Sequence, residues 1–411
     1  MAKLNIYTLR RAYFIFTMFV TALCTAYMVI NDDNVNEMGT GRVFLARSIS
    51  ALCWVICAYW YIKDIIIVPI SSKANPFRNR TIQWYSWYVL LVGISTIITN
   101  TNEIKWLIYH LIIFGLPLLG LWGTFGYARR FGEQPHFYKM VAFVLLCAVA
   151  AYGIVYTTYN VLGERGHFGV AYYTLYLLPL MVACDKKWVR YIALAVIGVV
   201  IISSVKRGGL VALAMGLLTY LLVKRHIEQK GIKGRIITLL LVLVVSLVFY
   251  FAVVNLGDNI LERLFNSDDD TGSGRTEIWA GIFQRLVEQD FSNWIFGNGY
   301  LATMTGTSNG SWSGFSAHND FLECLYDYGV VTLFCYFGFL LSWAKYIVRT
   351  IRQRSRFAAP LAMMWVMYVI LSMISIIVLY YTSLLSMITV GTLIGWNEYE
   401  QHNPLPNTLK Q

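Results

Sequence analysis

Long apolar stretches separated by short polar segments recur along almost the whole chain. Each is close to the ~20 residues that an α-helix needs to cross ~30 Å of hydrocarbon. The pattern predicts about 12 membrane-spanning helices. They are expected at residues 11–30, 43–62, 81–99, 106–127, 140–159, 168–184, 188–204, 208–223, 235–254, 321–344, 357–378 and 379–396.

The composition favours a polytopic all-α membrane protein over a soluble one. Of the 411 residues, 57% are hydrophobic and only 13% are charged, against about 25% charged in soluble globular proteins. The first residues, "MAKLNIYTLRRAYFIF", lead into an apolar stretch without a small-residue cleavage site, so we interpret them as a retained first helix and not a signal peptide. The seven cysteines fall in or beside expected spans without a CxxC pair, which indicates packing residues.

Positive charge is distributed unevenly between the loops. The net charge is +11, and most of the 33 Lys and Arg residues lie in every second loop. Because basic loops stay in the cytoplasm, these residues are interpreted as helix anchors on the cytoplasmic side and not as a nucleic-acid site. They lie at 63–80, 129–139, 186–190, 224–235 and 345–356, together with Lys3, Arg10, Arg11 and Lys410.

One outer segment, residues 255–320, is long enough to fold outside the bilayer. It separates a first set of spans (1–254) from a last set of spans with a cytoplasmic tail (321–411). Within it, "RTEIWAGIFQRLVEQD" places apolar residues at helical spacing with charged residues elsewhere on the wheel. This pattern predicts an amphipathic helix along the membrane face. Its apolar positions are Ile278, Trp279, Ile282, Phe283 and Val287.

Basic residues in outer loops are few, and each is a candidate for substrate binding. Arg165 lies in "GERGHFG", Lys206 and Arg207 lie in "SSVKRGGL", and Arg275 lies in "GSGRTEIW". A guanidinium is costly at membrane depth, and its planar fork matches phosphate oxygens. These three loops therefore predict a diphosphate held between them. Pairing with nearby acids is the alternative for Arg165 and Arg275, but Arg207 has no acid close to it in the sequence.

The stretch "SAHNDFLECLYDYG" at 316–329 gathers polar residues where an apolar helix is expected to begin. His318 is the only histidine of the long outer segment. A neutral imidazole accepts a proton from a hydroxyl near pH 7, so His318 is predicted to be the catalytic base. Asn319, Asp320, Glu323 and Trp279 are predicted to contact the substrate. Asn319 and Asp320 also suit a helix N-terminus, where their oxygens satisfy free backbone N–H groups.

The pieces "SSVKRGG", "GRTEIW…FGNGY" and "AHNDFLECLYDYG" resemble the signature regions of the O-antigen polymerase and O-antigen ligase superfamily. The resemblance covers roughly residues 160–345 as motifs and the whole chain as topology. It implies a transferase of the bacterial inner membrane whose site faces the periplasm. The implied donor is a glycan on undecaprenyl diphosphate, held by Arg207 and Arg275, and the implied base is His318. The resemblance implies no cofactor, no nucleotide sugar and no metal.

Two activities share this donor site, and a third function belongs to another class. A polymerase joins glycans to a new lipid-linked repeat unit, whereas a ligase moves the finished glycan to the lipid A core. Richness in Ile, Tyr and Asn favours the polymerase by association. A lipid-linked oligosaccharide transporter suits the number of spans, but the nearly uncharged spans and unmatched halves argue against it. The expected partners are the lipid-linked glycan, a sugar or lipid acceptor, membrane lipids and a chain-length regulator.

Overall fold

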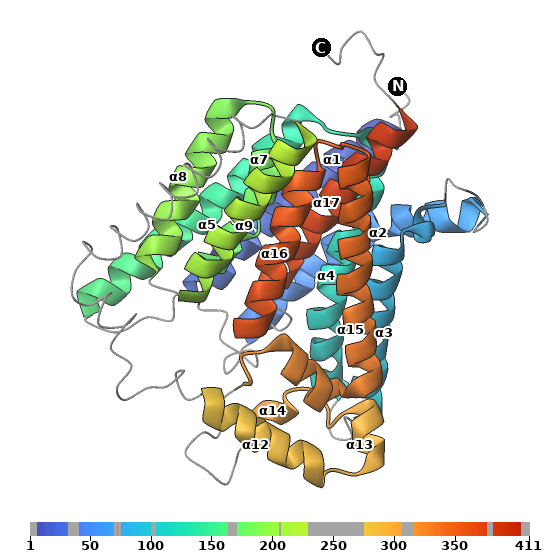
Figure 1. Ribbon diagram of the computed structural model, residues 1–411, viewed down its shortest axis with the longest axis vertical. Coiled ribbons are helices and arrows are strands. Elements are labelled where there is room, and N and C mark those ends of the chain that lie inside the picture. The colour runs from blue at the N-terminus through green and yellow to red at the C-terminus, as the bar shows by residue number, and fades with distance from the viewer. Residues whose placement is uncertain are drawn as a thin grey trace. The chain divides into compact units, whose positions relative to one another are not determined.

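The computed structural model describes residues 6–31, 41–69, 72, 75–99, 104–162, 171–204, 207–228, 275–305, 316–375 and 381–403. Within these ranges every regular element is a helix (Figure 1). Seven of the helices in the described ranges are long and apolar enough to cross a membrane. The chain is therefore an all-α polytopic membrane protein, as its sequence predicts. These seven are α1 (Ile6–Ile30), α2 (Gly41–Ile67), α3 (Arg80–Thr99), α4 (Ile104–Phe131), α5 (Pro135–Leu162), α9 (Arg207–Ile227) and α15 (Asp320–Arg352).

The remaining apolar helices correspond to the other expected spans, with one difference. The stretch expected at 168–184 forms two short helices, α6 (Ala171–Leu175) and α7 (Leu178–Ala183), with Pro179 in the first turn of α7. The expected boundary at 378/379 lies outside the described residues. The described residues before and after it belong to α16 (Ala358–Ile374) and α17 (Thr382–His402). The expected span 188–204 is α8 (Lys187–Ser203), and 235–254 lies outside the described residues.

The helices form two compact units, each of which is described by itself. Unit 1 comprises Met1–Val89, Ile108–Ser204 and Val378–Gln411. In this unit α1 packs against α2 and α5, and α17 packs against α6 and α7. The Thr389 hydroxyl donates to the Tyr176 carbonyl at 2.8 Å, which satisfies a backbone acceptor in the turn between the two short helices. Unit 1 also holds the 3-10 helix η2 (Pro76–Arg78).

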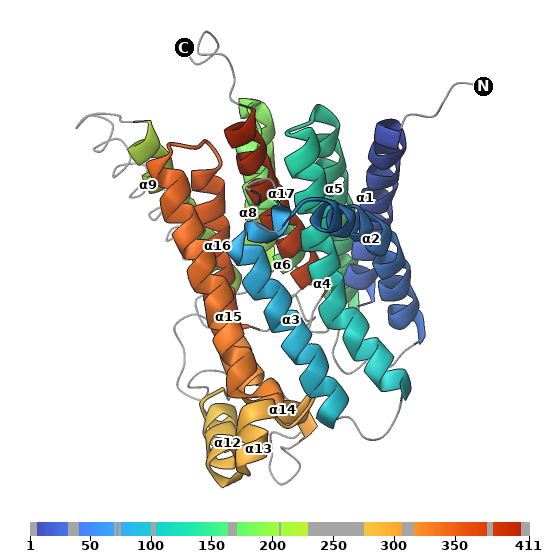
Figure 2. The same ribbon diagram turned by 90° about the vertical axis from the view of Figure 1, so that its right-hand side faces the viewer.

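Unit 2 comprises Leu90–Leu107 and Val205–Ile377. In it α16 packs between α9 and α15. A Cβ on Gly216 of α9 would lie 2.6 Å from Met367 Cγ, so the small residue permits the close approach of α9 and α16. Three further helices, α12 (Arg275–Glu288), α13 (Phe291–Phe296) and α14 (Ala302–Thr305), lie where α15 begins, and α9 begins at that same end of the unit (Figures 1 and 2).

Candidate active site

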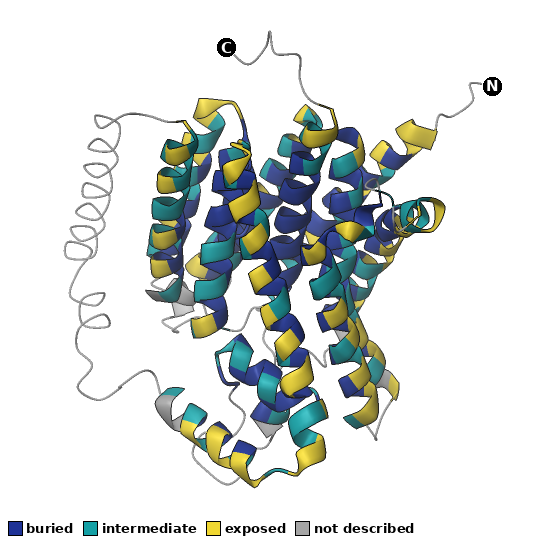
Figure 3. Cartoon of the chain, turned by 45° about the vertical axis from the view of Figure 1, so that its right-hand side comes forward, coloured by how far each residue is buried: buried dark blue, intermediate teal, exposed yellow. Residues whose placement is uncertain are grey.

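The predicted amphipathic helix is confirmed as α12, although its buried face differs from the one expected. Ile278, Ile282 and Leu286 recur every four residues and are at most 3% exposed. They pack against Ala317, Leu322 and Tyr326, before and within the first turns of α15. Phe283 and Val287, expected on the same face, are 54% and 81% exposed, so α12 carries a second apolar stripe that faces outward (Figure 3).

A break in α15 and the loop after α13 interlock through their backbones. Gly329 has φ 81°, which interrupts the helix. The interruption frees carbonyl groups of the preceding turn, and the amides of Asn298 and Gly299 donate to the carbonyls of Tyr326 and Asp327 at 3.0 and 2.9 Å. A Cβ on Gly329 would lie 2.1 Å from the Ile295 carbonyl oxygen. Gly297 of "FGNGY" and Gly329 of "DYG" are therefore both required by one close backbone contact.

Ala317, the residue before His318, has both of its backbone polar groups hydrogen-bonded to side chains. The Ala317 N–H donates to Glu323 Oε1 at 2.6 Å. The Ala317 carbonyl accepts from Trp279 Nε1 at 2.7 Å, so side chains of α12 and α15 both hydrogen-bond to Ala317. His318 follows with φ 50°, a left-handed conformation that is uncommon for a residue other than glycine and that gathers at functional sites. Its side chain is half-buried.

Two carboxyl groups one helical turn apart, Glu323 and Asp327, lie beneath this peptide. They are 5% and 0% exposed. Thr303 of α14 joins them: its hydroxyl donates to Glu323 Oε2 and its backbone N–H donates to Asp327 Oδ1 at 2.9 Å. The sequence prediction missed Thr303, because its partners are 20 and 24 residues away and no local pattern marks it. The acids and Thr303 form a buried polar bridge between α14 and α15.

The two residues after His318 have roles at the start of α15. Asn319 Oδ1 accepts from the N–H groups of Phe321 and Leu322 at 3.0 and 3.2 Å, which confirms the helix cap that the sequence suggested. Asp320 is 1% exposed, and the Tyr336 hydroxyl lies 3.5 Å from its Oδ2. Substrate contact by either residue stays a prediction.

The structure describes some of the predicted cationic residues in full and others only in part or not at all. Arg275 is the first residue of α12 and is half-buried. It lies four residues before Trp279, and residues four apart share a helix face about one turn (~5–6 Å) from each other. Arg275 therefore lies one helical turn from Trp279, whose indole is bonded to Ala317. Arg207 opens α9, in the same unit, but its side chain, like all of Arg165, Lys206 and the acids 268–270, lies outside the described residues.

A further guanidinium, which the sequence analysis did not single out, lies beside the interlock. Arg285 of α12 stacks over the Tyr326 ring at 4.9 Å and donates from Nε to the Gly281 carbonyl at 3.2 Å. Its two terminal nitrogens are buried without a hydrogen-bond partner among the described residues. Within the same residues no group of three His, Cys, Asp or Glu is placed to hold a metal ion.

The unit thus combines a strained histidine on a rigid peptide with at least one nearby arginine outside the apolar helices. This pairing of a base with a cation suits the transfer of a group from an anionic leaving group. Comparison with known proteins supports such chemistry. Residues 192–337 match the family model described as O-antigen ligase. The matched region confirms the resemblance to the O-antigen polymerase and ligase superfamily, and it supports a function of that type. No curated protein matches the chain.

Proposed function

We propose that this protein is a glycosyltransferase of the bacterial inner membrane that polymerises glycan repeat units at the periplasmic face. Its donor is a glycan on undecaprenyl diphosphate. The observation that carries the proposal is the left-handed His318, fixed by Ala317 contacts to both α12 and α15. Strain at one polar residue, held by hydrogen bonds on its neighbour, is expected where a side chain must point to a reacting atom.

The reaction needs one base and a stabilised leaving group. An acceptor sugar hydroxyl attacks the anomeric carbon of the donor, and its oxygen forms the new glycosidic bond. The bond between that carbon and the diphosphate oxygen breaks, and its electron pair leaves with the lipid diphosphate. The hydroxyl proton passes to the neutral imidazole of His318 and then to water. No covalent intermediate with the protein is required.

The arginines act on the leaving group. Arg275 and Arg207 hold the diphosphate and offset the charge that develops on it, which is the role of an oxyanion donor. Planar guanidinium groups suit this task because they bind two phosphate oxygens at once. We also propose that Arg165 and Lys206 add positive charge to the binding of the diphosphate.

Glu323 and Trp279 act as positioning residues and not as direct substrate ligands. Both hydrogen bonds that hold the Ala317 peptide come from these side chains. Glu323 is also tied to Thr303, so its direction is fixed. Loosening either contact releases His318 from its left-handed conformation, and a displacement of the base by about 1 Å is enough to cost about 100-fold in rate.

The decisive experiment supplies purified protein with a lipid-linked repeat unit, with and without core lipid A. A polymerase forms a ladder of longer lipid-linked glycans in both reactions. A product that forms only with lipid A core, and carries the glycan on it, assigns the ligase function. Unchanged donor in both reactions, from protein that is folded and inserted, removes the proposal of glycan transfer.

A further inference from the structure

A cavity of about 220 Å³ opens in unit 1 at the C-terminal end of α4. It is lined by Asp64, Pro76, Gly126, Arg129, Arg130 and His402. The charge pattern predicts this end of α4 to be cytoplasmic, and none of these residues belongs to the candidate active site. The volume is below the ~300 Å³ at which pockets for drug-sized ligands begin, so the cavity suits a small group.

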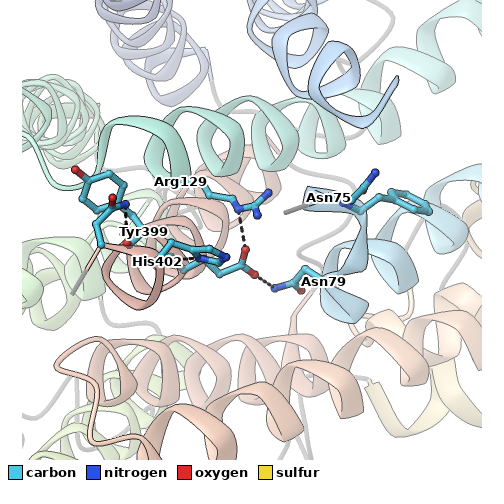
Figure 4. Close-up of polar contacts among 8 residues, drawn as sticks. Asn75, Asn79, Arg129, Tyr399 and His402 are labelled. Carbon is cyan, nitrogen blue, oxygen red and sulfur yellow. Dashed lines mark hydrogen bonds and ion pairs between the residues drawn. The ribbon is translucent and has the colours of Figure 1, made fainter. Parts of the chain in front are cut away.

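Arg129 is fixed beside this cavity by a carboxyl group whose two oxygens are both engaged (Figure 4). Its Nε lies 3.1 Å from Glu398 Oε2. Asn79 Nδ2 donates to Glu398 Oε1 at 2.8 Å. His402 Nδ1 lies 2.7 Å from the backbone carbonyl oxygen of Glu398. A guanidinium carries five N–H donors, so this single contact through Nε leaves donors for a group in the cavity.

Two more arginines, Arg130 and Arg10, lie near a second acid of the cavity, Asp64. Arg130 contacts Asp64 Oδ1 at 3.5 Å through Nη1 and the Tyr7 hydroxyl at 3.3 Å through Nη2. Asp64, Gly126 and Arg130 also line a second, smaller cavity of about 20 Å³ that reaches Arg10. Arg10 is 5% exposed, and its Nε has no hydrogen-bond partner among the described residues. A buried donor without an acceptor is costly, which indicates that an acceptor enters here.

The charges around the two cavities do not cancel. Three guanidinium groups, those of Arg10, Arg129 and Arg130, face two carboxyl groups, those of Asp64 and Glu398. A site with surplus guanidinium charge, fixed side chains and room for a small group favours a tetrahedral anion with several oxygens. Basic pockets between membrane helices on the cytoplasmic side bind the headgroups of anionic lipids.

We propose that this cavity binds a phosphate group, with Arg129 and Arg130 as its direct ligands and Arg10 supporting them from beneath. The phosphate belongs either to the headgroup of an anionic phospholipid or to a small soluble phosphate ester. The two sources share the chemistry that the arginines recognise. The site is distinct from the proposed glycan-transfer site, so its existence does not depend on that function.

The test measures the thermal midpoint of delipidated, purified protein in detergent during titration with phosphatidylglycerol, phosphatidylcholine or glycerol 1-phosphate. Phosphatidylglycerol or glycerol 1-phosphate should raise the midpoint, whereas phosphatidylcholine should not. The pair Arg129→Gln and Glu398→Gln, introduced together so that no carboxyl group loses its partner, should raise the half-maximal concentration about tenfold or more. That is the loss expected for one charge-assisted hydrogen bond.

Controls separate binding at this cavity from a general effect of charge. Arg190→Gln removes an arginine of α8 whose Nη2 bonds the Asp185 carbonyl and which does not line the cavity, and it should titrate like the unchanged protein. If the double variant does not fold, Arg129→Lys keeps the charge without the fork and should still weaken the response. A response to the lipid alone assigns a headgroup, and a response to glycerol 1-phosphate a soluble ester. No response to either, or equal titrations in all variants, overturns the site.

Discussion

Replacing Gly297 by alanine should open the contact between the loop after α13 and the break in α15. Gly297 has φ 80° and ψ −176°, a region open essentially to glycine alone. A Cβ there would lie 2.2 Å from the Asp327 carbonyl oxygen and 2.4 Å from the Tyr328 nitrogen. Both are backbone atoms of α15, so no side-chain rotation relieves the overlap and the two segments must separate.

The cost can be worked from the bonds that separation breaks. Asn298 loses its backbone and side-chain bonds to the Tyr326 carbonyl, and Gly299 loses its bond to the Asp327 carbonyl. At about 1 kcal/mol net for each hydrogen bond, the loss is about 3 kcal/mol, before ~1–3 kcal/mol of backbone strain. The contact should then open more than about 100-fold more often.

Hydrogen exchange on protein in nanodiscs measures this opening directly. The amides of Asn298 and Gly299 should exchange more than about 100-fold faster in Gly297→Ala, while peptides from α4 exchange as before. Glycan transfer should fall as well, because His318 lies two residues before the start of α15. Gly281→Ala is the matched control: its Cβ meets nothing within 4 Å, and alanine favours the helix by ~0.5–1 kcal/mol. Unchanged exchange at Asn298 and Gly299 would refute the interlock.

Further predictions concern the chemistry. His318→Ala should lower the turnover rate by about 100- to 10,000-fold with normal insertion; near-normal product would remove it as the base. Arg275→Ala should cost ~2–4 kcal/mol of transition-state stabilisation, with only partial recovery in Arg275→Lys because lysine lacks the fork; full activity of the lysine variant would argue against direct phosphate binding. Glu323→Gln should lower kcat about tenfold with little change in KM. Added to His318→Ala, it should not lower the residual rate further. The control Glu288→Gln, at an exposed position of α12, should match the unchanged protein. Chelation by EDTA should leave the rate unchanged; loss of turnover that Mg²⁺ restores would contradict a metal-free mechanism.

The sequence predicted the helical architecture because apolar runs of membrane length carry their own signal. The ends of the helices were less accessible: α2 continues to Ile67 and α15 to Arg352, where polar and charged residues follow the apolar run. The break at Gly329 was also missed. One glycine inside an apolar stretch fits a continuous helix equally well, and its positive φ is set by the backbone of a segment some 30 residues away.

The site residues and their roles stay predictions, and the structure adds contacts that the sequence did not indicate. Helical spacing correctly identified α12, but α12 bears two apolar stripes and spacing alone does not say which of them is covered. Glu323 was predicted to contact the substrate, and in the structure its side chain is buried. Its burial depends on Thr303 and the Ala317 N–H, and neither partner is recognisable as such until α14 is folded against α15.

These contacts divide the motif residues into two classes that mutation can separate. Gly297, Gly329, Asn319 and Glu323 act on the backbone: they close the interlock, cap α15 and hold the Ala317 peptide. His318 follows Ala317 in the chain, and the two hydrogen bonds of Ala317 hold the backbone beside its φ of 50°. Changes in the first class should therefore alter hydrogen exchange and activity together. Changes at His318 or Arg275 should alter activity while the framework exchanges as before, and that dissociation is what distinguishes a reacting group from its support.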